Sequence, residues 1–468
     1  MSTTTTSGRS FRDQVATVDA GGKRVWIYPR QPKGRLTNYR KWVGLVFLVL
    51  LFGLPFCRVD GHPLFLFNIL ERRFILFGQI FWPQDFFLFA VGMLLFVVFV
   101  ALFTVVFGRI FCGWVCPQTI FMELVFRPVE YWIEGDANQQ KRLAAAAWNR
   151  GKITRKAAKW SIFWLISFVI ANTFLAYIIG VEELYGIITG PVRRHAGGLA
   201  AICVFSTVFF LVYAWFREQV CATVCPYGRL QGVLLDKSSI VVAYDYKRGE
   251  PRGKVKQEDA GDCVDCKQCV RVCPTGIDIR NGTQLECVNC TACIDACDQV
   301  MTARQRETGL IRYASEEQVA RKRPFRMTAR MKAYTAVMLI LLAVEAFLVL
   351  SRTDVSASIL RTPGQLYQER SSTQWSNLYN YKLVNKTYHD KVVTLAPGNF
   401  KGSIDIVGGY TLRIPGGGAI TGSLFICRDK HLVQARKTDL DIHVLEAGKK
   451  VQTVAVTFLG PFQNDNNK

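Results

Sequence analysis

The sequence predicts a mixed membrane protein with an α-helical bundle of five transmembrane spans, an inserted ferredoxin-like double 4Fe–4S module and a C-terminal β-sandwich. Three observations lead to this prediction. Five apolar stretches approach the length of a bilayer-spanning helix, which is about 20 residues. Two copies of C-x2-C-x2-C-x3-C stand between Cys263 and Cys297. Residues 352–468 contain alternating apolar and polar positions separated by Gly, Pro and Asn turns, which is typical of short strands.

The composition agrees with this mixed character. Half of the 468 residues are hydrophobic, yet 20% are charged and the formal net charge is +22. A basic balance can indicate nucleic-acid binding. Lys and Arg, however, gather beside the apolar stretches, which is the pattern of the positive-inside rule, so we expect no nucleic-acid partner. Residues 1–37 are polar and then basic, without an early apolar core, so we expect no secretory signal peptide.

The apolar stretches define the expected topology. They lie at approximately 40–57, 86–108, 159–180, 198–217 and 333–351. The segments richest in Lys and Arg are expected in the cytoplasm, and the poorer segments 58–85 and 181–197 outside. The predicted domains are a cytoplasmic basic tail (1–39), a four-span membrane domain (40–235), a cytoplasmic two-cluster ferredoxin domain (236–332), a fifth transmembrane helix (333–351) and an outer domain (352–468).

Segment 62–82 is ambiguous. It is apolar enough to resemble a span, but Glu71, Arg72 and Arg73 stand at its centre. Each charge there would cost about 2.5–3.5 kcal/mol on insertion scales. We interpret the segment as an interfacial or re-entrant piece on the outer face, because a crossing would send the downstream basic loops to the wrong side.

The tandem cysteine runs predict two iron–sulfur clusters with crossed ligands. Three closely spaced cysteines grip one cluster, and the fourth, which we expect to begin a helix, reaches the other. The predicted ligands of the first cluster are Cys263, Cys266, Cys269 and Cys297, and those of the second are Cys287, Cys290, Cys293 and Cys273. A zinc site would leave the third cysteine of each run without a purpose. A disulfide framework would need an oxidising compartment.

A second thiol constellation comes from an internal repeat. The second apolar stretch ends in FCGWVCPQTIF and the fourth in VCATVCPYGRL, so each delivers C-x3-C-P. Cysteines four apart share one face of a helix, and a helix that begins at the proline would lower a thiol pKa. Two parallel copies would bring together Cys112, Cys116, Cys221 and Cys225. Soft thiolates there suit Cu(I) or a further iron–sulfur centre; the alternative is that these are small packing residues at helix ends.

Further candidate residues lie outside the cysteine runs, and several cofactor-binding motifs are absent from the sequence. We predict that Cys427 is a buried, apolar-like residue on a strand. Glu123 has two open roles, a hydrogen bond to a bound ion or a first-turn acid of a helix. The five histidines fall outside the predicted spans, which disfavours membrane haem. C-x-x-C-H and nucleotide-binding glycine motifs do not occur, so we expect no haem, no flavin and no nucleotide, and electrons must come from a separate donor.

These motifs resemble the cytochrome c oxidase accessory proteins of the CcoG/FixG/RdxA family, which are polyferredoxin-type membrane proteins. The resemblance rests on FCGWVCPQTIFMELVFRPVEYWIEGD at 111–136, VCATVCPYGRLQG at 220–232, YDYKRGEPRGK at 244–254, the cysteine runs within 261–301, GLIRYASE at 309–316 and NYKLVNKT at 380–387. It implies a bacterial inner-membrane protein, required for maturing cbb3-type oxidase, that reduces Cu(II) to Cu(I) for insertion. It also implies that the tail is immunoglobulin-like and periplasmic.

The motifs and the resemblance together predict a one-electron cupric reductase. A cytosolic donor would reduce the clusters, electrons would pass singly to copper near the C-x3-C-P cysteines, and the product would go to a copper-transporting ATPase or an oxidase subunit. Two alternatives stay open. One is a quinol-linked electron-transfer subunit resembling the membrane ferredoxins of nitrate-reductase systems, and the other is a non-enzymatic assembly scaffold with redox-sensing clusters. The tail at 352–468 favours the accessory-protein interpretation, because those ferredoxins lack a β tail.

Overall fold

The computed structural model describes residues 16–461 except residues 20, 60, 70–72, 83–84, 254–259, 323 and 410. The chain forms two compact units. The first comprises Met1–Pro55, Gly92–Ala176 and Gly180–Ala343, and the second comprises Phe56–Val91, Tyr177–Ile179 and Val344–Lys468. Both cysteine constellations therefore belong to the first unit, and the C-terminal strands belong to the second.

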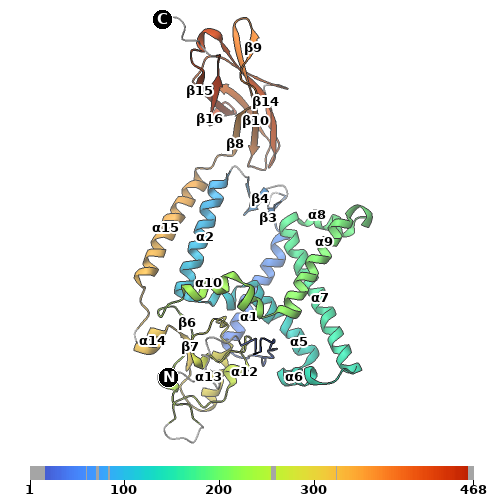
Figure 1. The fold of residues 1–468 in the computed structure, drawn as a ribbon, viewed down its shortest axis with the longest axis vertical. Helices are drawn as coiled ribbons and strands as arrows, with labels where there is room; N and C mark the ends of the chain where they lie inside the picture. The colour runs from blue at the N-terminus through green and yellow to red at the C-terminus, as the bar shows by residue number, and fades with distance from the viewer. Residues whose placement is uncertain are drawn as a thin grey trace. The chain divides into compact units, whose positions relative to one another are not determined.

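Five helices are long and apolar enough to cross a bilayer, as predicted. They are labelled in Figure 1 as α1 (Arg35–Gly53), α2 (Phe86–Phe107), α7 (Arg150–Ile179), α9 (Val192–Leu211) and α15 (Ala329–Leu350). α7 begins after Asn149, whose side chain accepts a hydrogen bond from the backbone N–H of Lys152 at 2.8 Å. α9 is kinked near its start, at His195 (φ −116°, ψ 19°), which precedes the apolar stretch predicted at 198–217.

Segment 62–82 forms strands rather than a membrane helix. A three-stranded antiparallel sheet consists of β3 (Phe65–Asn68), β4 (Arg73–Leu76) and β5 (Gln79–Phe81). Phe77 and Gly78 both have positive φ, as a two-residue hairpin turn requires. The sheet buries one face, formed by Leu66, Ile75 and Ile80. Glu71 and Arg72, two of the charges that argued against a span, lie outside the described residues.

The cysteine runs lie between the two strands of a small sheet. β6 (Val241–Tyr244) pairs with β7 (Ile311–Ala314), and the runs carry helices α12 (Gln268–Arg271) and α13 (Ala292–Ala303). α1 begins against α13 (Figure 1), where Asp295 accepts hydrogen bonds from the backbone N–H groups of Leu36 and Thr37 at 3.1 and 2.7 Å. An acidic group is favourable at a helix N-terminus, so this contact ties the first membrane helix to the cysteine module.

The expected helix starts at the fourth cysteines are wrong. Cys273 follows α12, and Cys297 lies inside α13. Both helices begin instead just after the second cysteine of their run, because the preceding residues, Lys267 and Thr291, adopt the left-handed conformation and cap the helix. The fourth cysteine of the first run therefore stands just after a helix, and that of the second run stands within one.

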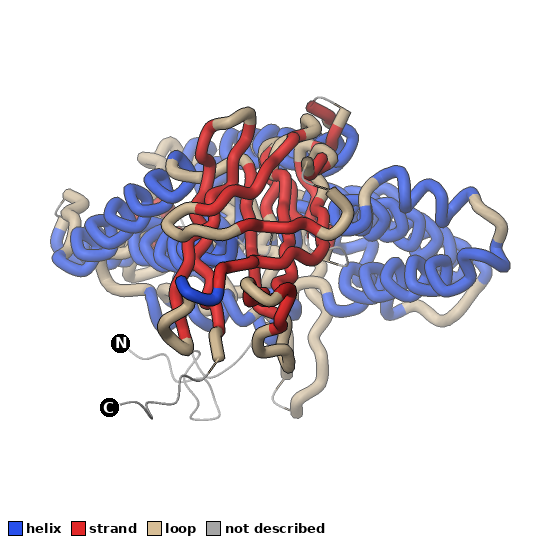
Figure 2. Tube along the Cα trace, turned by 90° about the horizontal axis from the view of Figure 1, so that it is seen from above, coloured by secondary structure: helices blue, strands red, loops and turns tan. Residues whose placement is uncertain are grey.

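The C-terminal domain is a sandwich of two antiparallel sheets, as predicted. One sheet has the order β12-β14-β10-β8, with β9 also on β10, and the other has the order β13-β11-β15-β16. The strands, red in Figure 2, are β8 (Val355–Arg361), β9 (Gln368–Ser371), β10 (Gln374–Asn385), β11 (Lys391–Pro397), β12 (Ser403–Ile406), β13 (Leu412–Ile414), β14 (Ala419–Asp429), β15 (Lys437–Glu446) and β16 (Lys449–Leu459).

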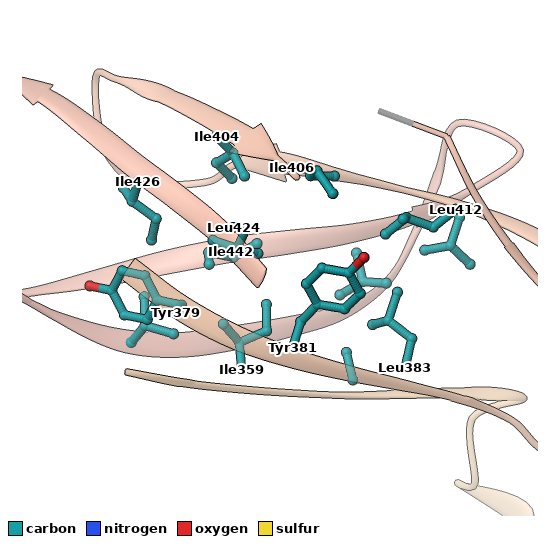
Figure 3. Packing of buried hydrophobic residues seen from close by; sticks show 14 of the residues in the cluster. Ile359, Tyr379, Tyr381, Leu383, Ile404, Ile406, Leu412, Leu424, Ile426 and Ile442 are labelled. Atoms are coloured by element: carbon teal, nitrogen blue, oxygen red, sulfur yellow. The ribbon is translucent and has the colours of Figure 1, made fainter. Parts of the chain in front are cut away.

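Alternate residues of these strands point into one core. Figure 3 shows Tyr379, Leu424 and Ile442 packed together, and all three are fully buried. Cys427 on β14 is also buried, as predicted. Its sulfur is the acceptor for Arg370 Nη1 at 2.9 Å.

A buried ion-pair group joins the segment before α2 to the sandwich domain within the second unit. The carboxylate of Asp85 contacts Arg352 Nη2 at 2.9 Å and Lys386 Nζ at 2.5 Å. All three side chains are at most 12% exposed. The pKa of Asp85 lies below its ordinary value; burial alone would raise it, but Lys386 and Arg352 together outweigh that effect.

We expect Asp85→Asn to destabilise the second unit by about 3 kcal/mol at pH 7, because it leaves two buried cations without their shared anion. A depressed carboxyl pKa stabilises the fold above the unfolded-state pKa, about 3.9 for Asp, and this stabilisation is lost as the pH falls through the folded-state pKa. The difference between wild type and variant should therefore shrink below about pH 4. Thermal unfolding of the full chain in detergent measures it.

The matched control for that experiment is Asp390→Asn. Asp390 pairs with Arg413 at 2.9 Å, but both side chains are exposed, so we expect a much smaller loss of stability than for Asp85→Asn. Equal losses of stability in the two variants would contradict a special role for Asp85.

Candidate functional site

The structure gathers the eight cysteines of the tandem runs around two cavities. The first cysteine pocket, about 350 Å³, is lined by Cys263, Cys266, Cys269 and Cys297. The second cysteine pocket, about 340 Å³, is lined by Cys273, Cys287, Cys290 and Cys293, and also by Cys269, which lines both pockets. Each pocket thus collects three cysteines of one run and the fourth of the other.

Left-handed residues shape both cysteine loops. Asp265 and Lys267 flank the second cysteine of the first run, and Asn289 and Thr291 flank that of the second, all with φ between 47° and 65°. This conformation costs free energy for residues with a side chain. Its repetition at equivalent positions curls each loop in the same way, so that three thiols face one cavity. The C-x2-C-x2-C spacing was the signal of this loop, but the backbone conformation was not readable from it.

Burial governs the electrostatics of these thiols. Loss of hydration raises the pKa of Cys269, Cys287 and Cys297 to about 12, and that of Cys290 to about 11. Neighbouring cysteines raise these values further, because adjacent thiolates repel. Four thiolates in one pocket therefore require a positively charged group to offset burial and repulsion, and a cluster of four iron atoms supplies it. The donor set fits a 4Fe–4S cluster in each pocket, which when bound exchanges one electron at a time.

The C-x3-C-P cysteines lie at breaks between short helices. Cys112 is in α3 (Ile110–Trp114) and Cys116 caps α4 (Pro117–Ile120). Cys221 is in the π-helix η6 (Val220–Val224) and Cys225 caps α10 (Pro226–Leu234). The predicted helix starts at Pro117 and Pro226 are confirmed.

The expectation that each cysteine pair shares one helical face is wrong. Cys116 and Cys225 have extended backbone, with ψ of 123° and 113°. A proline disfavours helical backbone in the residue before it, so the same prolines that begin α4 and α10 end the preceding helices.

The four thiols nevertheless come close to one another. Cys221 interacts electrostatically with Cys116, Cys112 and Cys225. Burial raises the pKa of Cys221 to about 12 and also raises that of Cys116, where the N–H groups of Thr119 and Gln118 only partly offset it. The expected lowering of a thiol pKa at these helix starts is therefore wrong for Cys116. Within the described residues, no three His, Cys, Asp or Glu side chains converge on a single metal ion.

The first thiol motif packs directly on the second cysteine pocket. Cys112 shares a hydrophobic cluster with Val288 and Cys290. A Cβ added to Gly113 would stand 2.4 Å from the carbonyl oxygen of Val288 and 2.9 Å from backbone atoms of Asn289, so only glycine allows this approach. The two thiol constellations are thus in contact through the loop that carries Cys287 and Cys290.

Polar residues that no motif indicated as functional hold this contact. Arg40 Nε donates to the carbonyl of Gly113 at 2.7 Å. Trp114 Nε1 donates to the hydroxyl of Tyr313 at 3.0 Å, and that hydroxyl donates to the carbonyl of Asn289 at 3.2 Å. The glycine within FCGWVC and the tyrosine within GLIRYASE were visible in the motifs, but nothing in a single sequence indicates that they meet.

A buried group of charges lies beside the thiol motifs. Glu130 in α5 (Arg127–Glu134) accepts two hydrogen bonds from Arg217, at 2.8 and 2.9 Å. Arg217 lies four residues before Cys221, and Glu130 follows the first C-x3-C-P motif. The Arg217–Glu130 ion pair therefore joins the segments that carry the two motifs. Glu123 lies in the first turn of the π-helix η4 (Phe121–Phe126), one of the two roles left open for it, and accepts a hydrogen bond from Arg127 Nε at 2.6 Å.

Comparison with known proteins agrees with this architecture. Residues 216–316 match the family of the 4Fe–4S dicluster domain, residues 89–136 match a 4Fe–4S binding domain, and residues 346–461 match the IG-like fold at the C-terminal of FixG. RdxA of Cereibacter sphaeroides is 34% identical, covering 85% of this chain and 88% of its own length. The chain belongs to the FixG/RdxA family.

Further members support the assignment. RdxB of Cereibacter sphaeroides is 32% identical over 92% of this chain and 95% of its own length. FixG of Rhizobium meliloti, a nitrogen fixation protein, is 38% identical over 63% of this chain and 58% of its own. This chain is a membrane iron–sulfur electron-transfer protein of the FixG/RdxA type with an immunoglobulin-like C-terminal domain.

Proposed function

We propose that this FixG/RdxA protein reduces Cu(II) to Cu(I) for the assembly of cbb3-type cytochrome c oxidase. The eight cysteines of the two pockets ligate its 4Fe–4S clusters, in the two crossed sets that the spacing predicts. Copper is the substrate and meets Cys112, Cys116, Cys221 and Cys225. The protein lies in a bacterial inner membrane, with its N-terminus and clusters in the cytoplasm and its C-terminal domain in the periplasm.

The contact between the second cysteine pocket and the first thiol motif carries this proposal. Cys112 and Cys290 pack in one hydrophobic cluster, and Gly113 lies against the backbone between Cys287 and Cys290. Reduction of Cu(II) takes one electron, which is the unit an iron–sulfur module delivers. Soft thiolates then favour Cu(I), the product.

Copper is cargo rather than a resident cofactor in this proposal. A site for cargo must release it, and the Cu(I) product is to pass to a copper-transporting ATPase or an oxidase subunit. We therefore propose that the thiols close around copper only while it is being reduced.

We expect the variant in which all four C-x3-C-P cysteines are serine to lose Cu(I) formation by about tenfold or more while keeping its clusters. The reduced full chain in detergent is mixed with Cu(II), and a Cu(I)-specific chelator reports the product. Cys203→Ser is the matched control, because Cys203 is exposed on α9 and belongs to neither constellation. An unchanged rate in the fourfold variant, with iron content intact, would reject the copper site.

A second candidate for the same cysteines is a third iron–sulfur centre. The match of residues 89–136 to a 4Fe–4S binding domain favours it, since that range contains Cys112 and Cys116. Iron analysis separates the candidates: about eight iron atoms per chain fit two clusters, whereas about twelve fit three. A third centre would support electron transfer to an acceptor other than copper.

A further inference from the structure

The two cysteine pockets differ in what covers them. The second pocket lies against the C-x3-C-P motif through Val288 and Asn289. The first pocket reaches the surface at Cys266, which is exposed, whereas Cys263 and Cys269 are buried. The second pocket therefore faces the C-x3-C-P thiols. The first pocket faces the surface, where a partner could approach it.

A basic cavity adjoins the exposed Cys266. It includes Cys266 in its wall. Val264, Val272 and Val300 in its lining are buried or half-buried, whereas the lining cations Arg30, Lys33 and Arg304 are exposed. An apolar centre with a charged rim is the usual anatomy of a protein interface.

The charge of this cavity has one sign. None of the described residues that line it is acidic. Lys33 and Arg304 are exposed and form no ion pair with any described residue. The nearby Asp265 and Asp295 are engaged elsewhere, with Arg280 at 2.5 Å and with the first turn of α1 respectively. The cations of the rim are thus available to a partner.

We propose that the basic cavity is the docking site for a small acidic one-electron carrier protein of the ferredoxin class. This rests on the proposed electron-transfer function. At each encounter the carrier is oxidised by one electron and the iron–sulfur module is reduced by one, with no bond made or broken. Complementary charge steers such encounters and raises the association rate. Electrons would then be taken up at Cys266 and leave toward Cys112.

The test is binding of an oxidised, fluorescently labelled plant-type ferredoxin to the full chain in detergent, followed by fluorescence anisotropy. Lys33→Glu with Arg304→Glu should weaken binding by about tenfold or more at low ionic strength, because two attractive rim charges become repulsive. Wild-type binding should also weaken as salt is raised. Lys237→Glu with Arg321→Glu is the matched control, since both residues are exposed and lie outside the cavity. Its binding should stay within about twofold of wild type.

Stopped-flow reduction supplies the second readout. Reduced ferredoxin should reduce the cavity variant about tenfold more slowly than wild type, while photoreduced deazariboflavin, a small neutral donor, should reduce both equally. Equal ferredoxin binding by wild type and cavity variant would overturn the proposal, as would an equal slowing with both donors. If the binding difference appears but neither donor reduces the wild type, the docking site stands and the electron-transfer function fails.

Discussion

Replacing Cys263 and Cys273 together by serine is expected to remove both clusters, whereas replacing Cys263 and Cys297 together should remove only one. The first two belong to the same sequence run but line different pockets, and the second two come from different runs but line one pocket. Iron should therefore fall from about eight atoms per chain to near zero in the first variant and to about four in the second. Metal analysis and electron paramagnetic resonance measure both.

A further pair of cysteines, taken from the second pocket, tests the same crossed arrangement. Cys273 and Cys287 come from different runs and both line the second pocket, so their joint replacement should also retain about four iron atoms. Cys203→Ser should retain all of the iron. If the pair within one run kept about four iron atoms and the pairs within one pocket kept none, the ligand sets would be uncrossed and the proposed assignment would be wrong.

The second large effect is expected from Arg217→Ala, which should destabilise the first unit by about 3–5 kcal/mol at pH 7. Arg217 and Glu130 are each 4% exposed and share two hydrogen bonds. Alanine would leave the carboxylate of Glu130 buried without this partner. Thermal unfolding in detergent measures the loss, and Arg321→Ala is the control, because Arg321 is 63% exposed and its removal should cost less than about 0.5 kcal/mol.

The stability difference between wild type and Arg217→Ala should depend on pH. Burial alone would raise the pKa of Glu130, but Arg217, ahead of Lys159 and Arg127, brings it below its ordinary value. The pair therefore stabilises the fold above the unfolded-state pKa, about 4.3 for Glu, and this contribution is lost as the pH falls through the folded-state pKa. The gap between wild type and Arg217→Ala should narrow below about pH 4. A gap that widened in acid would contradict the ion pair as its cause.

Periodic and compositional features were predictable from the sequence. The five spans follow from apolar runs, which must be helical where lipid offers no hydrogen bonds. The sandwich strands follow from alternation, and the starts of α4 and α10 follow from Pro117 and Pro226. Each of these signals acts within a few residues along the chain. The strands of segment 62–82 were not predictable in this way, because they owe their stability to a buried face that the linear pattern did not reveal.

The features of the candidate site also separate into those that the sequence predicts and those that depend on packing. Cysteine spacing identified the twelve candidate thiols and predicted two crossed ligand sets; the members of each set line one pocket, and Cys269 lines both. It did not predict the raised pKa of Cys116 and Cys221, because burial depends on what packs around the thiol. Nor did it place the helices of the cysteine runs, because left-handed residues such as Lys267 and Thr291 set where those helices begin.

By itself, the sequence determined the membrane character, the cluster motif and the repeat of C-x3-C-P, because each depends on residue type and spacing alone. Tertiary structure alone decided that Gly113 lies against Val288, that Arg217 pairs with Glu130, and that Cys266 is exposed beside a basic cavity. These contacts join residues far apart in the chain. Their energies come from close approach and from exclusion of water, which no local pattern encodes.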